Sequence, residues 1–418
     1  MKRRLALVVA AIVATTFGVA RPAEATHGHA ADGPADAVLA WSAIGAQAIS
    51  AGRPAASVMV QLGIEHVAMY DTAVALGLRA RPFLVRLHAR PDTSAAAAVA
   101  TAAHAVLVAR VSTERAFLDG TYREYLAGLP DGAAKNRGVE LGARVAAAVV
   151  AWRTGDGMDN TVPYVQPNPG PGVWEPTAPT PPVDLVLTQV RPLTLRTIDQ
   201  LRPAGPLPLS SRRYARDLNE TAARGRADSS TRTAEQTMSA RFWSENTGVQ
   251  WHRTVLRLAT AKRLDLGQTA RLLATVFVSA ADAGIACFDA KFHYMLWRPV
   301  HAIQRADTDG NPGTVADPTW QPLLNVNHPE YPSGHACLTG AVTAALAAYF
   351  HRDRVAFTMD STVTGTQVTF GSFHAALDQV TEARIDSGLH LRHSMHDGAG
   401  IGSRSAAWVV TRHFRLDG

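Results

Sequence analysis

Three short stretches in the last third of the chain combine cationic residues, histidine and small residues in a way that suits the binding of an oxyanion. The first contains Lys291 and Arg298, which is followed by Pro299 at the end of a long helical pattern. Seven residues advance a helix by about two turns, so both cations should lie on one face, roughly 10 Å apart. Because proline disfavours helix at the preceding residue, Arg298 should leave the helix, and the two cations can converge on one side. A solvated basic helix end is the alternative.

The second stretch is His328-Pro-Glu-Tyr-Pro332-Ser333-Gly334-His335, directly before an apolar helical pattern. A hydroxyl residue and a glycine at a helix entrance expose backbone N–H groups to a ligand, and the helix dipole favours negative charge there. This pattern predicts an oxyanion cradle with a histidine attached. An ordinary N-cap by Ser333, with His335 on the surface, would have the same sequence.

The third stretch runs from Arg384 to His390 and contains Gly388. On a continuous helix this spacing would place the arginine and the histidine on different faces. Gly388 is well placed to end the helix as a left-handed cap, so that His390 starts the next segment and points back at Arg384.

In this order the three stretches resemble the signature Lys-x6-Arg-Pro, Pro-Ser-Gly-His, Ser-Arg-x5-His-x3-Asp. It belongs to the superfamily that joins vanadium-dependent haloperoxidases with type 2 phosphatidic acid phosphatases. The chain is most similar to the bacterial haloperoxidase branch, because the likeness extends to residues 65–71, 307–313 and 318–320 and covers about residues 38–414.

The sequence departs from this signature at two positions. Ala383 stands where the signature has serine, and Ser394 stands where it has aspartate, four residues after His390. If that aspartate orients the histidine in relatives, Ser394 offers only a neutral partner, or Asp397 must substitute from another direction.

Vanadate and phosphate are both tetrahedral oxyanions, so one site can serve either. Arg298 and Arg384 suit the oxygens as bidentate donors, Lys291 as a point charge, and the Ser333 hydroxyl and the Gly334 N–H as neutral donors. The resemblance implies a vanadate cofactor with vanadium bound by His390. It also implies that His335 moves protons and that Lys291 polarises peroxide, so that halide is oxidised to hypohalous acid, which halogenates small organic acceptors.

His328, five residues before Ser333, is the residue expected to tune halide choice. In the family, chloroperoxidases of fungi carry phenylalanine at this position and bromoperoxidases carry histidine, so the resemblance implies a preference for bromide and iodide. We expect the imidazole to titrate around neutral pH. Simple packing beside Pro329 is the alternative.

Three other functions stay open at this point. An exported phosphatase would use the same residues, with His390 as the nucleophile that forms a phosphohistidine and His335 protonating the leaving alcohol. A divalent-metal hydrolase is suggested by His390, His393 and His396, followed by Asp397, although this spacing does not share one helical face. The third alternative is a non-catalytic protein that only binds an oxyanion.

The elements that must position these residues are almost all helical. Apolar residues recur at three- and four-residue spacing in ten segments, so we expect an all-α helical bundle with little or no β structure. A Thr- and Val-rich stretch at residues 355–369 could form a short hairpin, and the prolines and glycines of residues 156–208 predict an ordered crossover without continuous helix. The expected helices cover residues 38–50, 55–76, 94–118, 132–153, 232–246, 251–264, 267–297, 336–350, 372–387 and 398–414.

The composition is that of a globular protein. Of the 418 residues, 47% are hydrophobic and 18% are charged, enough apolar material for a large core. Arginine accounts for 37 of the 41 basic residues, a bias that gives no support to nucleic-acid binding. Cys287 and Cys337 are too few for a disulfide scaffold, and the sequence leaves open whether they form one bridge or are two buried thiols.

The N-terminus has the features of a signal peptide. Three basic residues at positions 2–4 precede an apolar run at 5–19, and a small-x-small cleavage pattern ends at Ala25. We therefore expect residues 1–25 to be removed and the protein to be secreted; loss of four basic residues and one acidic residue lowers the formal charge from +6 to +3.

No later stretch reaches the uninterrupted apolar length of about 20 residues that a membrane-spanning helix needs. We expect residues 26–418 to form a single α-helical domain whose C-terminal part, residues 267–418, carries the oxyanion site. Relatives often form dimers, so a homodimer is expected by analogy alone.

Overall fold

Helix α9, Leu266–Tyr294, is the core element, and α1 (Pro34–Ser50), α2 (Ala55–Ala75), α11 (Gly334–Phe350) and α13 (Arg392–Arg412) pack against it. The computed structural model describes residues 34–417, so the expected signal peptide at residues 1–25 lies outside the described part. Almost every side chain of α9 is buried, because the helix is apolar on all of its faces. Asp265 caps its N-terminus in a reciprocal pair with Gln268.

By length and composition alone, α9 could cross a membrane. In its most apolar window, however, 94% of the helix is buried inside the protein. Arg271 and Asp282 interrupt its apolar sequence, and its apolar side chains pack in the core of the protein.

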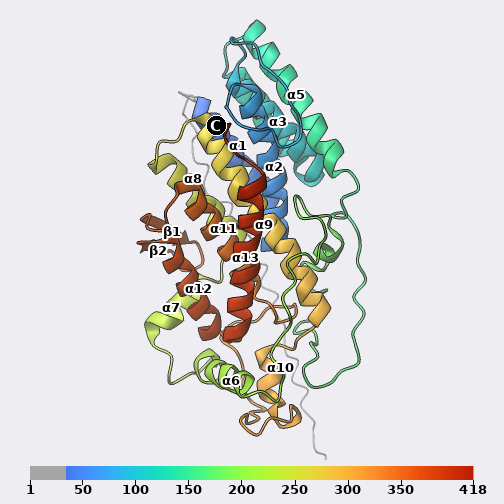
Figure 1. The fold of residues 1–418 in the computed structure, drawn as a ribbon, viewed down its shortest axis with the longest axis vertical. Coiled ribbons are helices and arrows are strands. Elements are labelled where there is room, and N and C mark those ends of the chain that lie inside the picture. The colour runs from blue at the N-terminus through green and yellow to red at the C-terminus, as the bar shows by residue number, and fades with distance from the viewer. Residues whose placement is uncertain (1–33, 418) are drawn as a thin grey trace, which may run out of the picture.

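Helices α3 and α5 lie near one end of the molecule, and α6 and α10 lie near the other (Figure 1). The elements before α9 are α1 (Pro34–Ser50), α2 (Ala55–Ala75), α3 (Ala95–Arg110), η1 (Ser112–Glu114), α4 (Arg115–Ala127), α5 (Ala133–Arg153), η2 (Leu185–Gln189), α6 (Arg212–Gly225), α7 (Ala234–Phe242) and α8 (Thr247–Ala261). Those after it are α10 (Pro299–Gln304), η3 (Ala306–Thr308), α11 (Gly334–Phe350), β1 (Phe357–Ser361), β2 (Thr366–Phe370), α12 (Phe373–Asp386) and α13 (Arg392–Arg412).

Most expected elements are present, including the hairpin, in which β1 and β2 pair antiparallel. The helix expected over residues 94–118 is instead two helices, α3 and α4, that meet at a bend of 116°. The break follows Val111, which leaves the helical conformation, and Ser112 and Thr113 then begin a short 3₁₀ turn. Helix α6 was not expected, because its sequence is dominated by charged residues.

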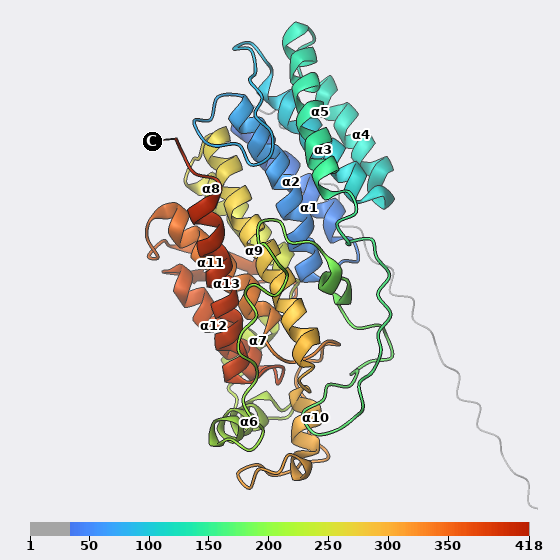
Figure 2. The same ribbon diagram turned by 45° about the vertical axis from the view of Figure 1, so that its right-hand side comes forward.

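The crossover at residues 156–208 contains only the short helix η2 and runs along the outside of the molecule from α5 to α6 (Figure 2). The side chain of Asn327 holds its middle part. Its Oδ1 accepts the N–H of Thr177 at 2.9 Å, and its Nδ2 donates to the carbonyl of Thr180 at 2.7 Å. The crossover is thereby attached to the loop that precedes α11.

Cys287 and Cys337 form a disulfide that links α9 to α11, with their Cα atoms 6.3 Å apart. Both cysteines are fully buried. The bridge joins the turn of α9 before Lys291 to the first turn of α11 after His335, so it ties together the two helices that carry the first and second stretches.

Candidate active site

The three stretches meet where α9 ends, where α11 begins, and where the chain passes from α12 to α13. Hydrogen bonds, close contacts and mutual charge effects connect their side chains. The structure therefore brings all eight predicted site residues into one region: Lys291, Arg298, His328, Ser333, Gly334, His335, Arg384 and His390.

The two cations of the first stretch are connected by a turn rather than by a continuous helix. Helix α9 ends at Tyr294, and Met295 adopts a left-handed conformation with φ 50°. Pro299 then starts α10, with Arg298 as its extended N-cap residue. The helix expected to reach residue 297 is therefore wrong in its last turn, whereas Arg298 lies outside the helix, as the following proline predicts.

Both cations hold the loop that precedes α11. Nζ of Lys291 donates to the carbonyl oxygens of Pro329 and Glu330, at 2.8 and 3.1 Å. Arg298 donates through Nε to the carbonyl of His328 at 2.6 Å, and through Nη2 to Nδ1 of the same residue at 2.7 Å. The cations and the loop thus form one connected unit.

His328 differs from the titrating group that the sequence led us to expect. Burial, followed by the charges of Lys291 and Arg298, lowers the pKa of its imidazole well below the usual value. Its Nδ1 accepts a hydrogen bond from Arg298, and its ring lies 5.3 Å from the ring of Phe288, measured between centroids. His328 is therefore a neutral wall of the site near pH 7, and the expectation of titration around neutrality is wrong.

Ser333 begins α11 and still keeps a proton for a ligand. Its Oγ accepts the N–H of Ala336 at 3.4 Å, which confirms the N-cap, and within residues 34–417 its hydroxyl donates to no acceptor. A Cβ placed on Gly334 would lie 3.7 Å from Cε of Lys291, so the glycine leaves open the space between the lysine and the first N–H groups of α11. A helix start of this kind attracts an oxyanion.

The turn after α12 brings His390 back to the other two stretches. Gly388 has φ 75°, which confirms the predicted left-handed cap. A Cβ at this position would lie 2.6 Å from the carbonyl oxygen of Gly225, so only glycine fits. Nε2 of His390 lies 3.5 Å from Nη1 of Arg298, and the charge of Arg384 contributes to the lowered pKa of the imidazole, after burial and the nearer cations.

Glu330 belongs to this site, although sequence reasoning missed it. Its Oε1 accepts hydrogen bonds from Nδ1 of His390 and from the N–H of Leu391, both at 2.9 Å. Neither of the two partners considered from the sequence, Ser394 or Asp397, is hydrogen-bonded to His390. The sequence did contain a signal for this role. The second stretch includes a carboxylate, Glu330, and the third stretch lacks the aspartate of the family signature.

Trp243, directly after α7, is a second residue that the sequence did not indicate. Its carbonyl oxygen accepts a hydrogen bond from Nη1 of Arg384 at 3.0 Å. A hydrogen bond between His335 and the backbone of Trp243 raises the pKa of the imidazole, against the larger lowering by burial. Its indole Nε1 donates to Oε1 of Gln379 at 2.9 Å, which fixes the ring against α12. No motif marks this tryptophan, because its role depends on the fold alone.

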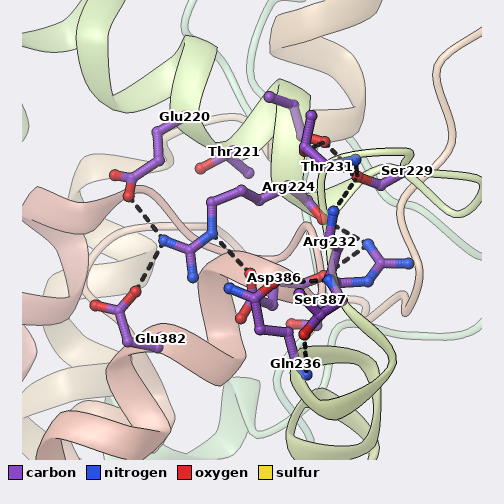
Figure 3. Close-up of polar contacts among 12 residues, drawn as sticks. Glu220, Thr221, Arg224, Ser229, Thr231, Arg232, Gln236, Glu382, Asp386 and Ser387 are labelled. Atoms are coloured by element: carbon purple, nitrogen blue, oxygen red, sulfur yellow. Dashed lines mark hydrogen bonds and ion pairs between the residues drawn. The ribbon is translucent and has the colours of Figure 1, made fainter.

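A polar network holds α6 and the segment after it against the end of α12 (Figure 3). Nε of Arg224 donates to Oδ1 of Asp386 at 2.7 Å, and Nη1 of Arg232 donates to the carbonyl of Asp386 at 3.1 Å. Oγ1 of Thr221 donates to the carbonyl of His390 at 3.0 Å. Helix α6 therefore supports the turn that carries the third stretch.

Three buried cations share the site with one buried carboxylate. Lys291, Arg298 and Arg384 are 0%, 1% and 2% exposed, and Glu330 is 0% exposed. Burial is the largest cause that lowers the pKa of both arginines to about 9 and that of Lys291 well below its usual value, and burial raises the pKa of Glu330. A bound anion would relieve this excess of buried positive charge.

Two buried nitrogens of the site, Nε2 of His335 and Nε of Arg384, have no hydrogen-bond partner in the described part of the chain. Buried polar atoms are rarely left without partners, so these positions suit the oxygens of a ligand. Together with the buried cations and the start of α11, they fit a tetrahedral oxyanion such as vanadate or phosphate.

The donors do not fit a divalent cation. Residues 34–417 contain no group of three or more His, Cys, Asp or Glu side chains arranged to hold a metal ion. His390 is buried against Arg298, His393 pairs with Asp397 at 3.2 Å, and His396 is exposed. The three histidines therefore do not converge, which argues against the divalent-metal hydrolase.

Comparison with known proteins identifies relatives of the chain. Residues 271–416 match the family described as VCPO second helical-bundle domain. A stretch of 93 residues is 37% identical to vanadium chloroperoxidase of Curvularia inaequalis and covers 20% of this chain and 15% of that relative.

Solved structures share the fold over nearly the full length. The crystal structure of the first bacterial vanadium-dependent iodoperoxidase is similar with a TM-score of 0.76 at 22% identity, over 92% of this chain and 97% of that chain. A holo-type bacterial vanadium-dependent chloroperoxidase is similar with a TM-score of 0.70 at 16% identity, over 86% of this chain and 92% of that one. The predicted all-α fold and the predicted resemblance are thereby confirmed.

Proposed function

We propose that the chain is a vanadate-dependent haloperoxidase. The premises are that its fold is that of bacterial vanadium-dependent haloperoxidases and that residues 271–416 match the family described as VCPO second helical-bundle domain. The reaction is the oxidation of halide by hydrogen peroxide to hypohalous acid, which halogenates small organic acceptors. The observation that carries the proposal is the cluster of Lys291, Arg298 and Arg384, three buried cations with one buried carboxylate beside them.

Several residues of the chain would contribute to the binding of vanadate. Arg298 and Arg384 are planar donors for the oxygens of vanadate, Lys291 is a point charge, and Ser333 with the Gly334 N–H adds neutral donors. His390 would hold the vanadium through Nε2, the ring nitrogen that Glu330 leaves free. When bound, vanadate supplies a Lewis acid that activates peroxide without a change of oxidation state.

His335 is the group proposed to move protons. Burial and the charge of Arg384 lower the pKa of its imidazole well below the usual value, so the ring is neutral and can accept a proton near pH 7. Its Nε2 has no partner in the described protein, so it is available to a ligand. Lys291 lies across the start of α11, where its charge can polarise peroxide.

For halide choice we propose that bromide and iodide are favoured over chloride. The support is His328, whose neutral ring accepts a hydrogen bond from Arg298 and lines the site. Chloride is the harder ion to oxidise, and a polar imidazole changes the field that the halide meets, in contrast to a hydrocarbon wall.

We also propose that the protein is secreted after cleavage near Ala25 and that residues 26–418 form one domain. The disulfide between Cys287 and Cys337 supports secretion, because such bridges persist in oxidising compartments. The largest hydrophobic cluster includes side chains from Ala37 to Phe414, which supports one domain.

The direct test combines two measurements on the purified protein. After incubation with orthovanadate and gel filtration, we expect stoichiometric vanadium and halide-dependent consumption of peroxide. His390→Ala should abolish vanadium retention, whereas His335→Ala should retain vanadium and lose most turnover. Release of phosphate from a generic ester without halide oxidation would instead establish the phosphatase alternative, in which His390 is the nucleophile.

A further inference from the structure

Of the acidic side chains in the described structure, only Glu330 is hydrogen-bonded to His390. Oε1 of the glutamate lies 2.9 Å from Nδ1 of the imidazole, and the two side chains are 0% and 1% exposed. The same oxygen accepts the N–H of Leu391 at 2.9 Å. Leu391 is the N-cap residue of α13 and has no side-chain cap of its own, so the glutamate also caps that helix.

This arrangement determines which nitrogen of His390 carries the proton. Because the Leu391 N–H donates to Oε1, that oxygen is an acceptor, and the Nδ1 atom that faces it must be the donor. The neutral ring then keeps its lone pair on Nε2, the nitrogen that lies 3.5 Å from Nη1 of Arg298. A histidine that binds a metal centre through one nitrogen commonly donates from the other to a carboxylate, which fixes the orientation of the ring.

The two other candidate partners of His390, Ser394 and Asp397, make hydrogen bonds with other groups. Oγ of Ser394 donates to the carbonyl oxygen of Glu330 at 3.4 Å and is not hydrogen-bonded to the imidazole. Asp397 accepts from the hydroxyl of Tyr331 and pairs with His393. No carboxylate of α13 therefore reaches His390.

The backbone of Glu330 fixes its side chain in place. Its carbonyl oxygen accepts from Nζ of Lys291 at 3.1 Å, and its N–H donates to the carbonyl of Leu296 at 2.9 Å. One residue thus connects the end of α9 with the start of α13. Because hydrogen bonds hold both the N–H and the carbonyl of Glu330, its carboxylate can orient the imidazole at a small cost in side-chain entropy.

We propose that Glu330 is the positioning residue of His390, fixing the proton on Nδ1 and directing Nε2 at the oxyanion, in place of the aspartate that the signature has at position 394. The part of this proposal that concerns vanadate rests on the proposed function. The part that concerns the proton on His390 does not.

The first experiment needs no ligand. Protein labelled with ¹⁵N-histidine should show a hydrogen-bonded Nδ1–H proton, assigned to His390 by its loss in His390→Ala. This proton should be lost in Glu330→Ala and kept in Glu65→Gln, a control at another fully buried glutamate, which has no hydrogen-bond partner in the described structure. A wild-type His390 with its proton on Nε2 overturns the proposal whatever the protein binds.

The second experiment measures affinity for orthovanadate by calorimetry, with thermal unfolding as the check on folding. Glu330→Gln keeps the size of the side chain and loses its charge, so vanadate affinity should fall by about 10–100-fold, the usual effect of removing such a partner. Glu65→Gln should stay within about twofold, well below that loss. Wild-type affinity in folded Glu330→Gln and Glu330→Ala would overturn the positioning role.

A third variant moves the carboxylate. Glu330→Ala/Ser394→Asp should bind vanadate at least about tenfold more tightly than Glu330→Ala, the lower end of the expected loss. A double variant no better than Glu330→Ala would contradict the claim that both positions serve one role. If the wild type shows the Nδ1–H proton and binds no vanadate, the proposed function fails and the positioning role stands.

Discussion

Breaking the disulfide between Cys287 and Cys337 should lower the free energy of unfolding by about 4 kcal/mol. The two cysteines are 50 residues apart in sequence, and closing a loop of that length removes about 14 cal/mol/K of chain entropy from the unfolded state, or about 4 kcal/mol at 25 °C. For a chain of this size the entropy of unfolding is roughly 0.8 kcal/mol/K, so the melting temperature should fall by about 5 °C.

The assay is equilibrium unfolding in urea, followed by tryptophan fluorescence, for Cys287→Ala, Cys337→Ala and the double variant. Each single variant breaks the same bridge, so all three should lose a similar free energy. The second alanine removes only one more buried sulfur, and the double variant should exceed the singles by no more than about 1 kcal/mol.

Two results would refute this reasoning. Losses below about 1 kcal/mol would mean that the bridge does not restrict the unfolded chain on the scale of its loop. Single losses that simply add in the double variant would mean that packing of the two sulfurs, rather than the covalent link, stabilises the contact of α9 with α11.

Three further predictions concern the site and the core. Arg384→Lys should weaken phosphate binding, measured by calorimetry, by about 1.5–3 kcal/mol for each charged hydrogen bond lost, and unchanged affinity would place this arginine outside the ligand shell. Wild-type turnover with bromide should exceed that with chloride at equal concentration, and His328→Phe should narrow the difference; equal rates in the wild type would contradict the assignment of halide choice to this residue. His66 and His252, which both contact Ser42 Oγ at 2.8 Å, have their pKa values lowered by burial to about 3, so below pH about 6.5 only the unfolded state takes up their protons. The unfolding free energy should therefore fall as pH drops from about 6.5 to 3, and His252→Gln should flatten that slope by up to about 1.4 kcal/mol per pH unit.

The helices that the sequence predicts well are those whose periodicity reports burial in the core. Helix α9 is apolar on all faces, and α11 follows a clear N-cap at Ser333, so both are visible without tertiary information. Helix α6 was missed because its exposed residues are charged and its partners lie in α12, although Ser211 was an available N-cap signal.

The site shows the same limit at the level of single residues. Lys291, Arg384 and the other motif residues could be predicted because each motif encodes its own local turn. Glu330 and His390 are 60 residues apart, and Trp243 and Arg384 are 141 apart, so only the packing of helices reveals these contacts. The neutral state of His328 was likewise hidden, because it depends on burial and on the guanidinium that donates to its ring.

The hydrogen bonds between the crossover and Asn327 connect the outside of the molecule to His328, the residue proposed to tune halide choice. The residues that hold the anion belong to helix ends that cannot shift without loss of the cradle, whereas Thr177 and Thr180 lie in an irregular segment on the outside. A substitution there would act on Asn327 and, through it, on the adjacent His328, whose carbonyl oxygen and ring accept hydrogen bonds from Arg298. A change in this outer segment can therefore reach the residue proposed to tune halide choice without replacing any residue proposed to hold the anion.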